Sequence, residues 1–415
     1  MKYIIKAPQH LHATINLPAS KSISNRALII SALAGNKEMP RHISDCDDTF
    51  VMVRALTKPS DTIDIMAAGT AMRFLSAYSA VKEGTRTITG TQRMKQRPIG
   101  ILTDALRTLG AQIEYVEEEG FPPLRITGGK HKGGNLSLPG NVSSQYISAL
   151  LMIGPVLQKG LELELTGDII SRPYINLTLQ LMKDFGAQAT WTDDRHIKVN
   201  PVPYQSTSYY IEGDWSAASY WYQIMALSSD EKAEIILPGL YRNSYQGDAA
   251  VQQLFKDLGV NTEFFKDKNG LECVRLTKQP LLAKRMDYDF INQPDLAQTF
   301  VVTCAMLDIP FHFRGLQSLK IKETDRINAL VRELGKLGYL IKDANDSELI
   351  WDGTKIQPQP HAAIDTYEDH RMAMAFAPCC LVREDIFIND PHVVSKSYPK
   401  YWEHLQQTGF EIESL

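Results

Sequence analysis

The sequence predicts an α/β protein of two domains, assembled from repeated units in which helices and strands alternate. Three observations support this prediction. The chain has 415 residues and a hydrophobic content of 44%, which is too long for one simple core. A glycine ends an apolar, helix-like run at five regularly spaced positions, and a strand-like segment follows each glycine. Six polar stretches also stand where a helix is expected to begin.

The five glycines define the repeat, because successive ones lie between 71 and 79 residues apart. They are Gly110, Gly186, Gly259, Gly338 and Gly409. Glycine caps helix C-termini because it adopts the left-handed backbone conformation without a steric penalty. One unit is therefore expected to run helix, strand, loop, helix, strand, strand over about 75 residues. A glycine between helix and strand is also common in α/β proteins without repeats, so this alternative stays open.

The first two units are less regular than the later ones. The segment Lys21–Leu56 predicts two helices around the polar residues 43–49. The segment Gly69–Gly110 predicts two more helices around the loop 92–98, and Pro98 is expected in the first turn of the second of them. Six units in total divide naturally into two groups of three.

The two ends of the chain are expected to belong to one domain. Tyr3–Ile5 and Ala13–Leu17 are strand-like but have no helix before them, and the last unit stops after the single strand 410–415. We expect the N-terminal strand to complete the C-terminal domain, with the chain crossing between domains near Ala19 and Glu212. The expected domains are residues 20–211, and residues 1–19 together with 212–415.

Composition excludes several classes of function. The formal net charge of −4, from 44 basic and 48 acidic residues, provides no basic field for nucleic acid. The longest strongly apolar stretch, Ile147–Leu157, is shorter than the roughly 20 residues that span a bilayer. The first 18 residues lack the apolar core of a signal peptide. Five cysteines without CxxC spacing fit a reduced, cytoplasmic protein.

Several well-known catalytic motifs are absent from the sequence. It contains no GxxxxGK[ST], GxGxxG or HExxH, which argues against a P-loop kinase, a Rossmann oxidoreductase and a zincin. The acidic run Asp45–Asp48 lacks the spaced ligands of a cation site and is interpreted as a capped, acidic helix start. No metal site is therefore expected.

The six polar stretches are the main indication of function, because a helix N-terminus attracts anions through its free N–H groups and its dipole. They are Ser20–Arg26, Ala67–Arg73, Asn141–Tyr146, Gly213–Ser219, Gln293–Thr299 and Tyr367–Ala373. Together, and with basic residues beside them, such ends would bind a multiply charged anionic substrate. Each stretch alone is equally compatible with an ordinary helix cap.

The first half of the chain supplies cations and neutral donors. Lys21 and Arg26 add positive charge where Ser20 or Ser22 can cap a helix. Gly69 at a helix start allows close backbone approach to a ligand, although a structural turn explains it as well. Arg97 shares a loop with two further basic residues, Arg93 and Lys95, and its guanidinium suits a phosphate or carboxylate. A solvated surface loop is the commoner explanation of such a run.

Neutral donors follow later in the first half of the chain. The hydroxyl and amide groups are those of Ser143, Ser144, Gln145, Ser171 and Tyr174.

The second half adds carboxylates to the cations. Asp295 opens an apolar helix, either as an N-cap or as a general base toward a hydroxyl. Lys322 and Arg326 flank Glu323, whose pKa the cations should lower, and Thr324 or Asp325 caps the next helix. Further along, Arg371 follows Asp369 and His370 at another helix start, and Lys396 precedes the last helix. A histidine such as His370 is more often structural than catalytic.

Taken together, these stretches resemble the EPSP synthase family of enolpyruvyl transferases. Nine motifs occur in the family's order: SKSISNRAL, AGTAMR, RMKQRPIG, VSSQY, SRPYI, EGDWSAASY, KETDR, EDHRMAMAF and SKSYP. Each motif is modest, but nine in order over nearly the whole chain are specific. The resemblance implies a two-domain enolpyruvyl-transferase-like fold, with three βαβαββ repeats per domain and an active site in the cleft between them.

The resemblance also implies a reaction. The family transfers the enolpyruvyl group of phosphoenolpyruvate to the 5-hydroxyl of shikimate 3-phosphate by addition and elimination, releasing phosphate. This step belongs to the shikimate pathway, which leads to chorismate and the aromatic amino acids. The resemblance implies two small-molecule substrates and no cofactor, and we expect a monomer with neither nucleic acid nor membrane as a partner. Two phosphates and a carboxylate require a local cluster of cations, since the chain as a whole is slightly acidic.

Roles follow from the resemblance residue by residue. The implied ligands of shikimate 3-phosphate are Lys21, Ser22, Arg26, Ser143, Ser144, Gln145, Ser171, Tyr174, Asp295, Ser318 and Lys322. The implied ligands of phosphoenolpyruvate are Lys21, Gly69, Arg97, Gln145, Arg326, Arg371 and Lys396. Asp295 matches the acceptor of the 5-hydroxyl proton, Glu323 the proton donor, and Lys21 is a third residue expected to act in catalysis.

Three positions depart from the family's usual pattern. Ala67 stands where the family usually has asparagine, Phe74 where it usually has proline, and Ser318 where it often has asparagine. The first two should alter the wall behind the phosphoenolpyruvate site, which leaves sensitivity to the inhibitor glyphosate open. Ser318 keeps a hydroxyl and stays a weaker ligand candidate.

Two alternatives come from other functions. The sister transferase that acts on UDP-N-acetylglucosamine usually carries a cysteine in the loop equivalent to 92–98, and this loop has none. A non-catalytic nucleic-acid-binding repeat protein would interleave aromatic residues with its basic ones. The loops here carry serine, glutamine and aspartate instead.

Overall fold

The chain divides into two compact units. The computed structural model describes residues 1–58, 60–384 and 386–415. The N-terminal unit is Ala19–Ile211, and the C-terminal unit combines Met1–Pro18 with Glu212–Leu415. The first boundary lies one residue before the one expected from the sequence.

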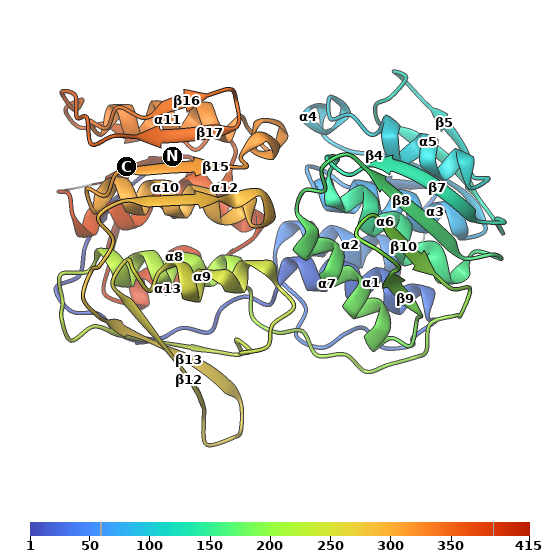
Figure 1. The fold of residues 1–415 in the computed structure, drawn as a ribbon, viewed down its shortest axis with the longest axis horizontal. Coiled ribbons are helices and arrows are strands. Elements are labelled where there is room, and N and C mark those ends of the chain that lie inside the picture. The colour runs from blue at the N-terminus through green and yellow to red at the C-terminus, as the bar shows by residue number, and fades with distance from the viewer. Residues whose placement is uncertain (59, 385) are drawn as a thin grey trace. The chain divides into compact units, whose positions relative to one another are not determined.

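The N-terminal unit contains two four-stranded sheets (Figure 1). In each, the first two strands pair in parallel and the remaining pairs are antiparallel. The first sheet has the order β3-β4-β6-β5, with β3 at Thr62–Asp64, β4 at Gly84–Thr89, β5 at Gln112–Tyr115 and β6 at Leu124–Gly128. The second has the order β7-β8-β10-β9, with β7 at Gly134–Pro139, β8 at Leu161–Thr166, β9 at Ala189–Trp191 and β10 at His196–Val199.

Three helices of the N-terminal unit, α1, α3 and α6, pack against one another in its core. The helices are α1 (Lys21–Leu33), α2 (Asp47–Thr57), α3 (Gly69–Val81), α4 (Gln92–Lys95), α5 (Gly100–Thr108), α6 (Ser144–Ile153) and α7 (Arg172–Asp184), and a 3-10 turn, η1, spans Gly154–Val156. Each of the two sheets and its helices form a βαβαββ repeat, as expected. The first repeat is incomplete: among the described residues it has α1, α2 and an isolated bridge between Arg41 and Tyr210, but no four-stranded sheet. The segment before α2 is polar and contains Pro40, so it lacks a strand-forming run.

The C-terminal unit contains three four-stranded sheets, each with the βαβαββ order. The middle repeat is uninterrupted, and its sheet has the order β14-β15-β17-β16. Its strands are β14 (Met286–Asp289), β15 (Phe311–Arg314), β16 (Lys342–Ala344) and β17 (Glu348–Trp351). The other two repeats each use one strand from the N-terminus of the chain.

The first 18 residues contribute β1 (Lys2–Lys6) and β2 (His12–Thr14) to two different sheets. Strand β2 pairs in parallel with β11, at the edge of a sheet with the order β12-β13-β11-β2. Strand β1 lies between β19 and β20, antiparallel to both, in a sheet with the order β18-β19-β1-β20. The remaining strands are β11 (Glu234–Pro238), β12 (Val260–Lys266), β13 (Glu272–Lys278), β18 (Ala363–Ile364), β19 (Ile386–Asn389) and β20 (Glu411–Ser414).

Three central helices also form the core of the C-terminal unit: α8, α10 and α12 pack against one another. The helices are α8 (Trp215–Leu227), α9 (Val251–Leu254), α10 (Ala297–Met306), α11 (Arg326–Lys336), α12 (His370–Phe376) and α13 (Tyr401–Gln407). Shorter 3-10 turns are η2 (Gly247–Ala250), η3 (Phe290–Asn292), η4 (Pro294–Leu296), η5 (Gln317–Ile321), η6 (Ala377–Leu381) and η7 (Pro391–Lys396). Every residue of α10 is buried, which explains its nearly continuous apolar sequence.

The backbone at the five glycines confirms the left-handed conformation expected of them, and four of the five directly follow the C-cap of a helix. All five glycines have φ between 81° and 110°, in the left-handed region. At Gly186 an added Cβ would also lie 2.8 Å from side-chain carbons of Gln205. A substitution there would therefore meet both backbone strain and a steric clash.

Two local predictions need correction or refinement. Helix α5 begins at Gly100 with Ile99 as its N-cap, so Pro98 precedes the helix and is not in its first turn. Helix α2 begins at Asp47 after Cys46, which makes no side-chain cap, so its start is acidic but lacks the side-chain cap expected.

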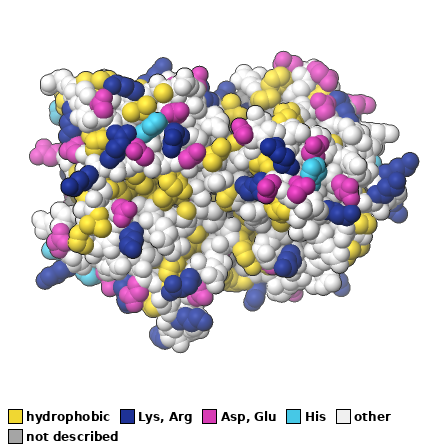
Figure 2. All heavy atoms as spheres, in the orientation of Figure 1, with side chains coloured by type: hydrophobic (Ala, Val, Ile, Leu, Met, Phe, Trp, Pro, Cys, Tyr) yellow, Lys and Arg dark blue, Asp and Glu magenta, His cyan; other side chains and the backbone are white. Residues whose placement is uncertain are grey.

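Among the described residues, every helix is too short or too polar to cross a bilayer. On the face drawn in Figure 2, basic and acidic side chains are interspersed.

Candidate active site

In the N-terminal unit, the predicted residues gather at the starts of the three central helices. The Ser20 hydroxyl caps α1 by accepting from the N–H of Ile23 at 3.4 Å. Ser143 caps α6 by accepting from the N–H of Gln145, also at 3.4 Å. The Gln145 side-chain amide donates to the Thr70 hydroxyl at 3.1 Å, which joins the start of α6 to the start of α3. The starts of α3 and α6 are therefore in contact.

Arg26 is buried in this region, and no carboxylate of the described residues forms an ion pair with it. Its Nε donates to the Thr178 hydroxyl at 2.7 Å, and its Nη2 donates to the Ser148 hydroxyl at 3.0 Å. Its Nη1 donates to the carbonyl of Ser22 at 3.0 Å. Burial lowers the pKa of Arg26 to about 10, and the nearby Tyr174 opposes this shift. The guanidinium has five N–H donors, so two remain for a ligand.

Two more arginines converge on the start of α3. A Cβ added to Gly69 would lie 2.4 Å from Nη1 of Arg73 and 2.6 Å from Nη1 of Arg97. A larger residue at this position would have to displace these guanidinium groups. The neighbouring Lys95 turns elsewhere and pairs with Glu117. Of the three basic residues in the loop 92–98, Arg97 is the one placed beside Gly69.

The remaining predicted residues of this unit lie close to the same helices. Lys21 is the first residue of α1, and its Nζ lies 3.4 Å from a carboxylate oxygen of Asp48. Ser144 is the first residue of α6. Ser171 precedes α7 in the left-handed conformation with φ of 55°, and Tyr174 lies in the first turn of that helix. A buried serine held in this strained conformation is typical of a functional site.

In the C-terminal unit, the buried Arg326 is the centre of the predicted cluster. Its Nε donates to Asp369 at 2.6 Å, its Nη2 to Glu323 at 2.9 Å and its Nη1 to Asp295 at 3.2 Å. Burial opposes the charged form, but the three carboxylates outweigh it and raise the pKa of Arg326. The guanidinium thus holds both predicted catalytic carboxylates.

Asp295 faces three cations at once. Besides Arg326, Nη2 of Arg371 lies 3.2 Å from one carboxylate oxygen and Nζ of Lys322 lies 3.6 Å from the other. Burial alone would raise the pKa of Asp295, but these cations hold it well below its usual range. Leu296, not Asp295, is the N-cap of α10, so the alternative of a structural cap is wrong here.

The last members of this cluster lie on 3-10 turns. Lys396 ends η7, and its Nζ lies 3.5 Å from a carboxylate oxygen of Glu323. Ser318 is in η5, four residues before Lys322. Asp325 accepts from the N–H of Asn328 at 3.1 Å and is therefore the cap of α11, as one of the two candidates expected.

Sequence reasoning assigned no role to Arg73 or Asp369, although both are built into the clusters. Arg73 ends the AAGTAMR stretch, four residues after Gly69, which is the helical spacing that brings its guanidinium back over the helix start. Asp369 caps α12 through the N–H of Arg371 at 2.9 Å and also binds Arg326. No local sequence pattern indicates that the carboxylate of Asp369, besides capping a helix, also pairs with the distant Arg326.

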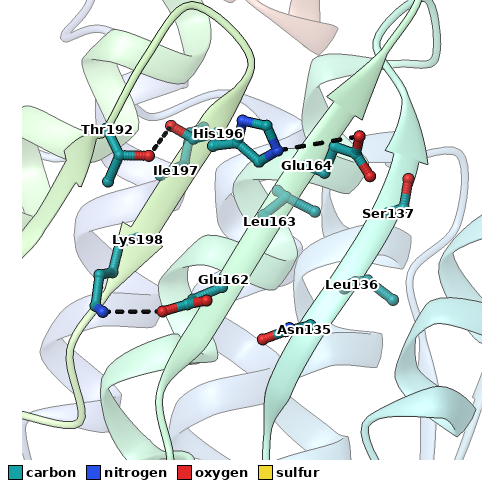
Figure 3. A pocket seen from close by; sticks show the side chains of 10 residues that line it. All are labelled: Asn135, Leu136, Ser137, Glu162, Leu163, Glu164, Thr192, His196, Ile197 and Lys198. Carbon is teal, nitrogen blue, oxygen red and sulfur yellow. Dashed lines mark hydrogen bonds and ion pairs between the residues drawn. The ribbon is translucent and has the colours of Figure 1, made fainter.

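A separate pocket lies on the face of the second sheet of the N-terminal unit (Figure 3). It is shallow, with a volume of about 560 Å³, and β7, β8 and β10 line it. Lys198 pairs with Glu162 at 2.9 Å, and His196 lies 4.0 Å from Glu164. None of the predicted site residues is among its lining residues.

Within the described part of the chain, no three His, Cys, Asp or Glu side chains are arranged to hold a metal ion.

Comparisons with known proteins show the family of this chain. The family model for EPSP synthase (3-phosphoshikimate 1-carboxyvinyltransferase) matches residues 5–58 and 52–405. The chain is 60% identical over 413 residues to the 3-phosphoshikimate 1-carboxyvinyltransferase of Bacteroides fragilis, covering 100% of this chain and 99% of that protein. It is 36% identical over 422 residues to the enzyme of the same name from Vibrio cholerae, covering 95% of this chain and 96% of the other. The chain therefore belongs to the EPSP synthase family.

Solved structures show the same fold. EPSP synthase from Acinetobacter baumannii matches with a TM-score of 0.79 at 20% identity, over 100% of both chains. The enolpyruvyl transferase NikO from Streptomyces tendae matches with a TM-score of 0.71 at 14% identity, over 99% of this chain and 98% of that one. These matches confirm the enolpyruvyl-transferase-like fold predicted from the sequence.

Proposed function

We propose that this chain is a 3-phosphoshikimate 1-carboxyvinyltransferase. It joins the enolpyruvyl group of phosphoenolpyruvate to the 5-hydroxyl of shikimate 3-phosphate and releases phosphate, a step of the shikimate pathway to chorismate and the aromatic amino acids. The observation that carries the proposal is the cluster around Arg326, which holds two carboxylates, Asp295 and Glu323, among cations. Family membership supports the choice of substrates.

The N-terminal unit suits the recognition of shikimate 3-phosphate. Lys21, Ser22 and Arg26 offer cations and a hydroxyl, and the start of α6 adds neutral donors for a hydroxylated ring. Gly69 and Arg97 lie together and suit a group of phosphoenolpyruvate. The C-terminal unit supplies Arg326, Arg371 and Lys396 for the second anion. The proposal requires that both clusters reach the same pair of substrates.

Asp295 is the proposed acceptor of the proton from the 5-hydroxyl. Its lowered pKa keeps it ionised at neutral pH, so it is ready to accept a proton once the hydroxyl oxygen attacks the central carbon of phosphoenolpyruvate. Lys322 at 3.6 Å stabilises the carboxylate and the alkoxide character that develops on the substrate oxygen. The new carbon–oxygen bond and protonation of the methylene carbon give a tetrahedral adduct.

Glu323 is the proposed proton donor to the methylene carbon. Arg326 and Lys396 hold its carboxylate at 2.9 and 3.5 Å. An incoming anion competes for these cations, which favours protonation of Glu323 before addition. In the elimination step the methyl group returns a proton, the carbon–oxygen bond to phosphate breaks and the enol ether forms. The atoms balance without a cofactor.

Localisation and assembly complete the proposal. All five cysteines are buried free thiols, which suits a reducing compartment, and we assign the protein to the cytoplasm as a monomer. Its partners are the two small-molecule substrates. The comparisons do not favour the alternative acceptor, UDP-N-acetylglucosamine, and an assay with that acceptor in place of shikimate 3-phosphate should give no phosphate release.

Two substitutions test the catalytic roles. Asp295→Asn and Glu323→Gln keep shape and remove the proton-transferring group, so kcat should fall by about 10²- to 10⁴-fold. Phosphate release from phosphoenolpyruvate with shikimate 3-phosphate measures turnover, and calorimetric titration shows that the variants still bind shikimate 3-phosphate. Asp287→Asn, an exposed aspartate of the same unit, is the matched control. Turnover near that of the wild type in either variant would reject its role.

A further inference from the structure

Two buried arginines of the N-terminal unit each lie over an aromatic ring. The Cζ atom of Arg26 is 5.3 Å from the ring centroid of Phe74, and that of Arg73 is 5.6 Å from the ring centroid of Tyr146. The first pair joins α1 to α3, and the second joins α3 to α6. The three central helices are therefore linked to one another by arginine–aromatic contacts.

Neither arginine is neutralised. Within the described part of the chain, no carboxylate lies within ion-pair distance of Arg26, whose three hydrogen-bond acceptors are all neutral. Arg73 is 7% exposed, and its buried Nε and Nη1 atoms have no hydrogen-bond partner among the residues that the structure describes. Burying an unpaired cation is costly, and such groups normally have a carboxylate or a bound anion beside them.

An aromatic ring differs from a carboxylate in how it holds a cation. The negative face of the ring attracts a guanidinium and fixes its plane, but it carries no net charge. A carboxylate would form a stronger contact and would also compete with any ligand anion for the same N–H donors. A ring therefore positions the arginine and leaves its full positive charge available.

We infer that Phe74 and Tyr146 are positioning residues that hold Arg26 and Arg73 for the anionic groups of the substrates. Arg73 thereby becomes a further anion-binding residue beside Gly69 and Arg97. The identity of the anions rests on the proposed function, and the positioning of the two arginines rests on their contacts with the rings. Phe74 stands where the resemblance to the family predicts proline, so this contact belongs to this chain's own sequence.

The alternative is a purely structural role, in which Phe74 only fills the core, since its side chain is 0% exposed. Phe185 offers a matched control, because it is equally buried in the same core and lies against Tyr209, not against an arginine. Phe74→Leu and Phe185→Leu should lose similar amounts of thermal stability through the smaller side chain. Only Phe74→Leu should also weaken anion binding.

Calorimetric titration with shikimate 3-phosphate, and separately with inorganic phosphate, measures that difference. For Phe74→Leu the dissociation constant should rise on the order of tenfold, the range expected for a desolvated cation–π contact. For Phe185→Leu it should stay within about twofold. Equal dissociation constants for Phe74→Leu and wild type would overturn the role of Phe74.

A double-mutant cycle separates positioning from packing. If Phe74 acts through Arg26, then Arg26→Met/Phe74→Leu should bind no more weakly than Arg26→Met alone, because the ring has lost its cation. Additive losses in the cycle would show that the ring acts through packing and would overturn the inference for this pair.

The second pair allows a conservative rescue. Tyr146 also donates its hydroxyl to the carbonyl of Pro98 at 2.6 Å, so removing the ring and removing the hydroxyl are separable changes. Tyr146→Phe keeps the ring and should bind phosphate and phosphoenolpyruvate nearly as the wild type does. Tyr146→Leu should bind them on the order of tenfold more weakly. Equal losses in both variants would assign the effect to the hydroxyl and overturn the role of the ring.

The two ligands keep this inference separable from the proposed function. If the wild type binds inorganic phosphate but not shikimate 3-phosphate, the proposed function fails, and the phosphate titrations of the variants still decide the role of the rings. If the wild type binds neither anion, the buried arginines are not anion receptors and the inference fails with it.

Discussion

The two units bury arginine in opposite ways. Arg26 in the N-terminal unit is 2% exposed and is surrounded by hydroxyls, a carbonyl and a ring. Arg326 in the C-terminal unit is 1% exposed and is surrounded by three carboxylates. Burial lowers the pKa of Arg26 to about 10, whereas the carboxylates raise the pKa of Arg326. The same side chain is thus left uncompensated in one unit and compensated in the other.

The helix caps show the same contrast. Ser20 and Ser143 cap central helices of the N-terminal unit, so their dipoles stay available to an anion. Asp214 and Asp369 cap central helices of the C-terminal unit and bring negative charge to the same kind of position. Central helices of one repeated fold thus begin with neutral caps in one unit and with charged caps in the other, which suits the anion binding and the proton transfer proposed for them.

Removing the compensated arginine should have the largest effect on stability. Arg326→Met would leave the fully buried Asp369 and the largely buried Asp295 and Glu323 without their shared cation, so the free energy of unfolding should fall by about 3–5 kcal/mol. Urea unfolding monitored by circular dichroism measures it. Arg332→Met, an exposed position on the same helix, serves as control and should change stability by less than about 1 kcal/mol. Similar small losses in both variants would contradict the role assigned to the network.

A smaller effect should come from a carboxylate that the C-terminal unit leaves uncompensated. Glu212 is buried, accepts hydrogen bonds from Ser244 and Gln246, and forms no ion pair among the described residues. Burial raises its pKa to about 7, although these hydrogen bonds oppose the shift. Between about pH 4 and pH 7 the folded form therefore holds a proton that the unfolded form has lost, so this group's contribution to stability falls as pH rises.

Glu212→Gln should remove that pH dependence. Relative to the wild type, the variant should gain on the order of 2 kcal/mol between pH 5 and pH 8. Urea unfolding at both pH values measures the gain, with the exposed Glu231→Gln as control. A stability difference that stays constant with pH would show that Glu212 is ionised throughout this range.

Much of this arrangement was predictable because it depends on local signals. Neighbouring residues alone show three of its features: the glycine after a helix, the polar residues before one, and the change from serine to aspartate between the two halves. The cations of the C-terminal cluster come from separate motifs, and it was the family resemblance that grouped them. Asp295 was ambiguous between cap and base, since both uses place an aspartate before a helix.

Other features depend on contacts between distant segments, which local patterns do not specify. The placement of Phe74 under Arg26 requires α1 and α3 to pack at one particular register. The shared contact of Asp369 and Arg326 joins two different repeats. The incomplete first repeat shows that repeated sequence signals do not guarantee a sheet in every unit.

The free energy of unfolding of Arg26→Met, measured in urea without any anion at pH 7, tests the central claim most directly. Methionine fills much of the space, and the Thr178 and Ser148 hydroxyls already lie 2.8 Å apart and can bond to each other. If Arg26 is an uncompensated cation held for a ligand, stability should stay within about 1 kcal/mol of the wild type. A loss of about 3–5 kcal/mol, as expected for Arg326→Met, would contradict the account.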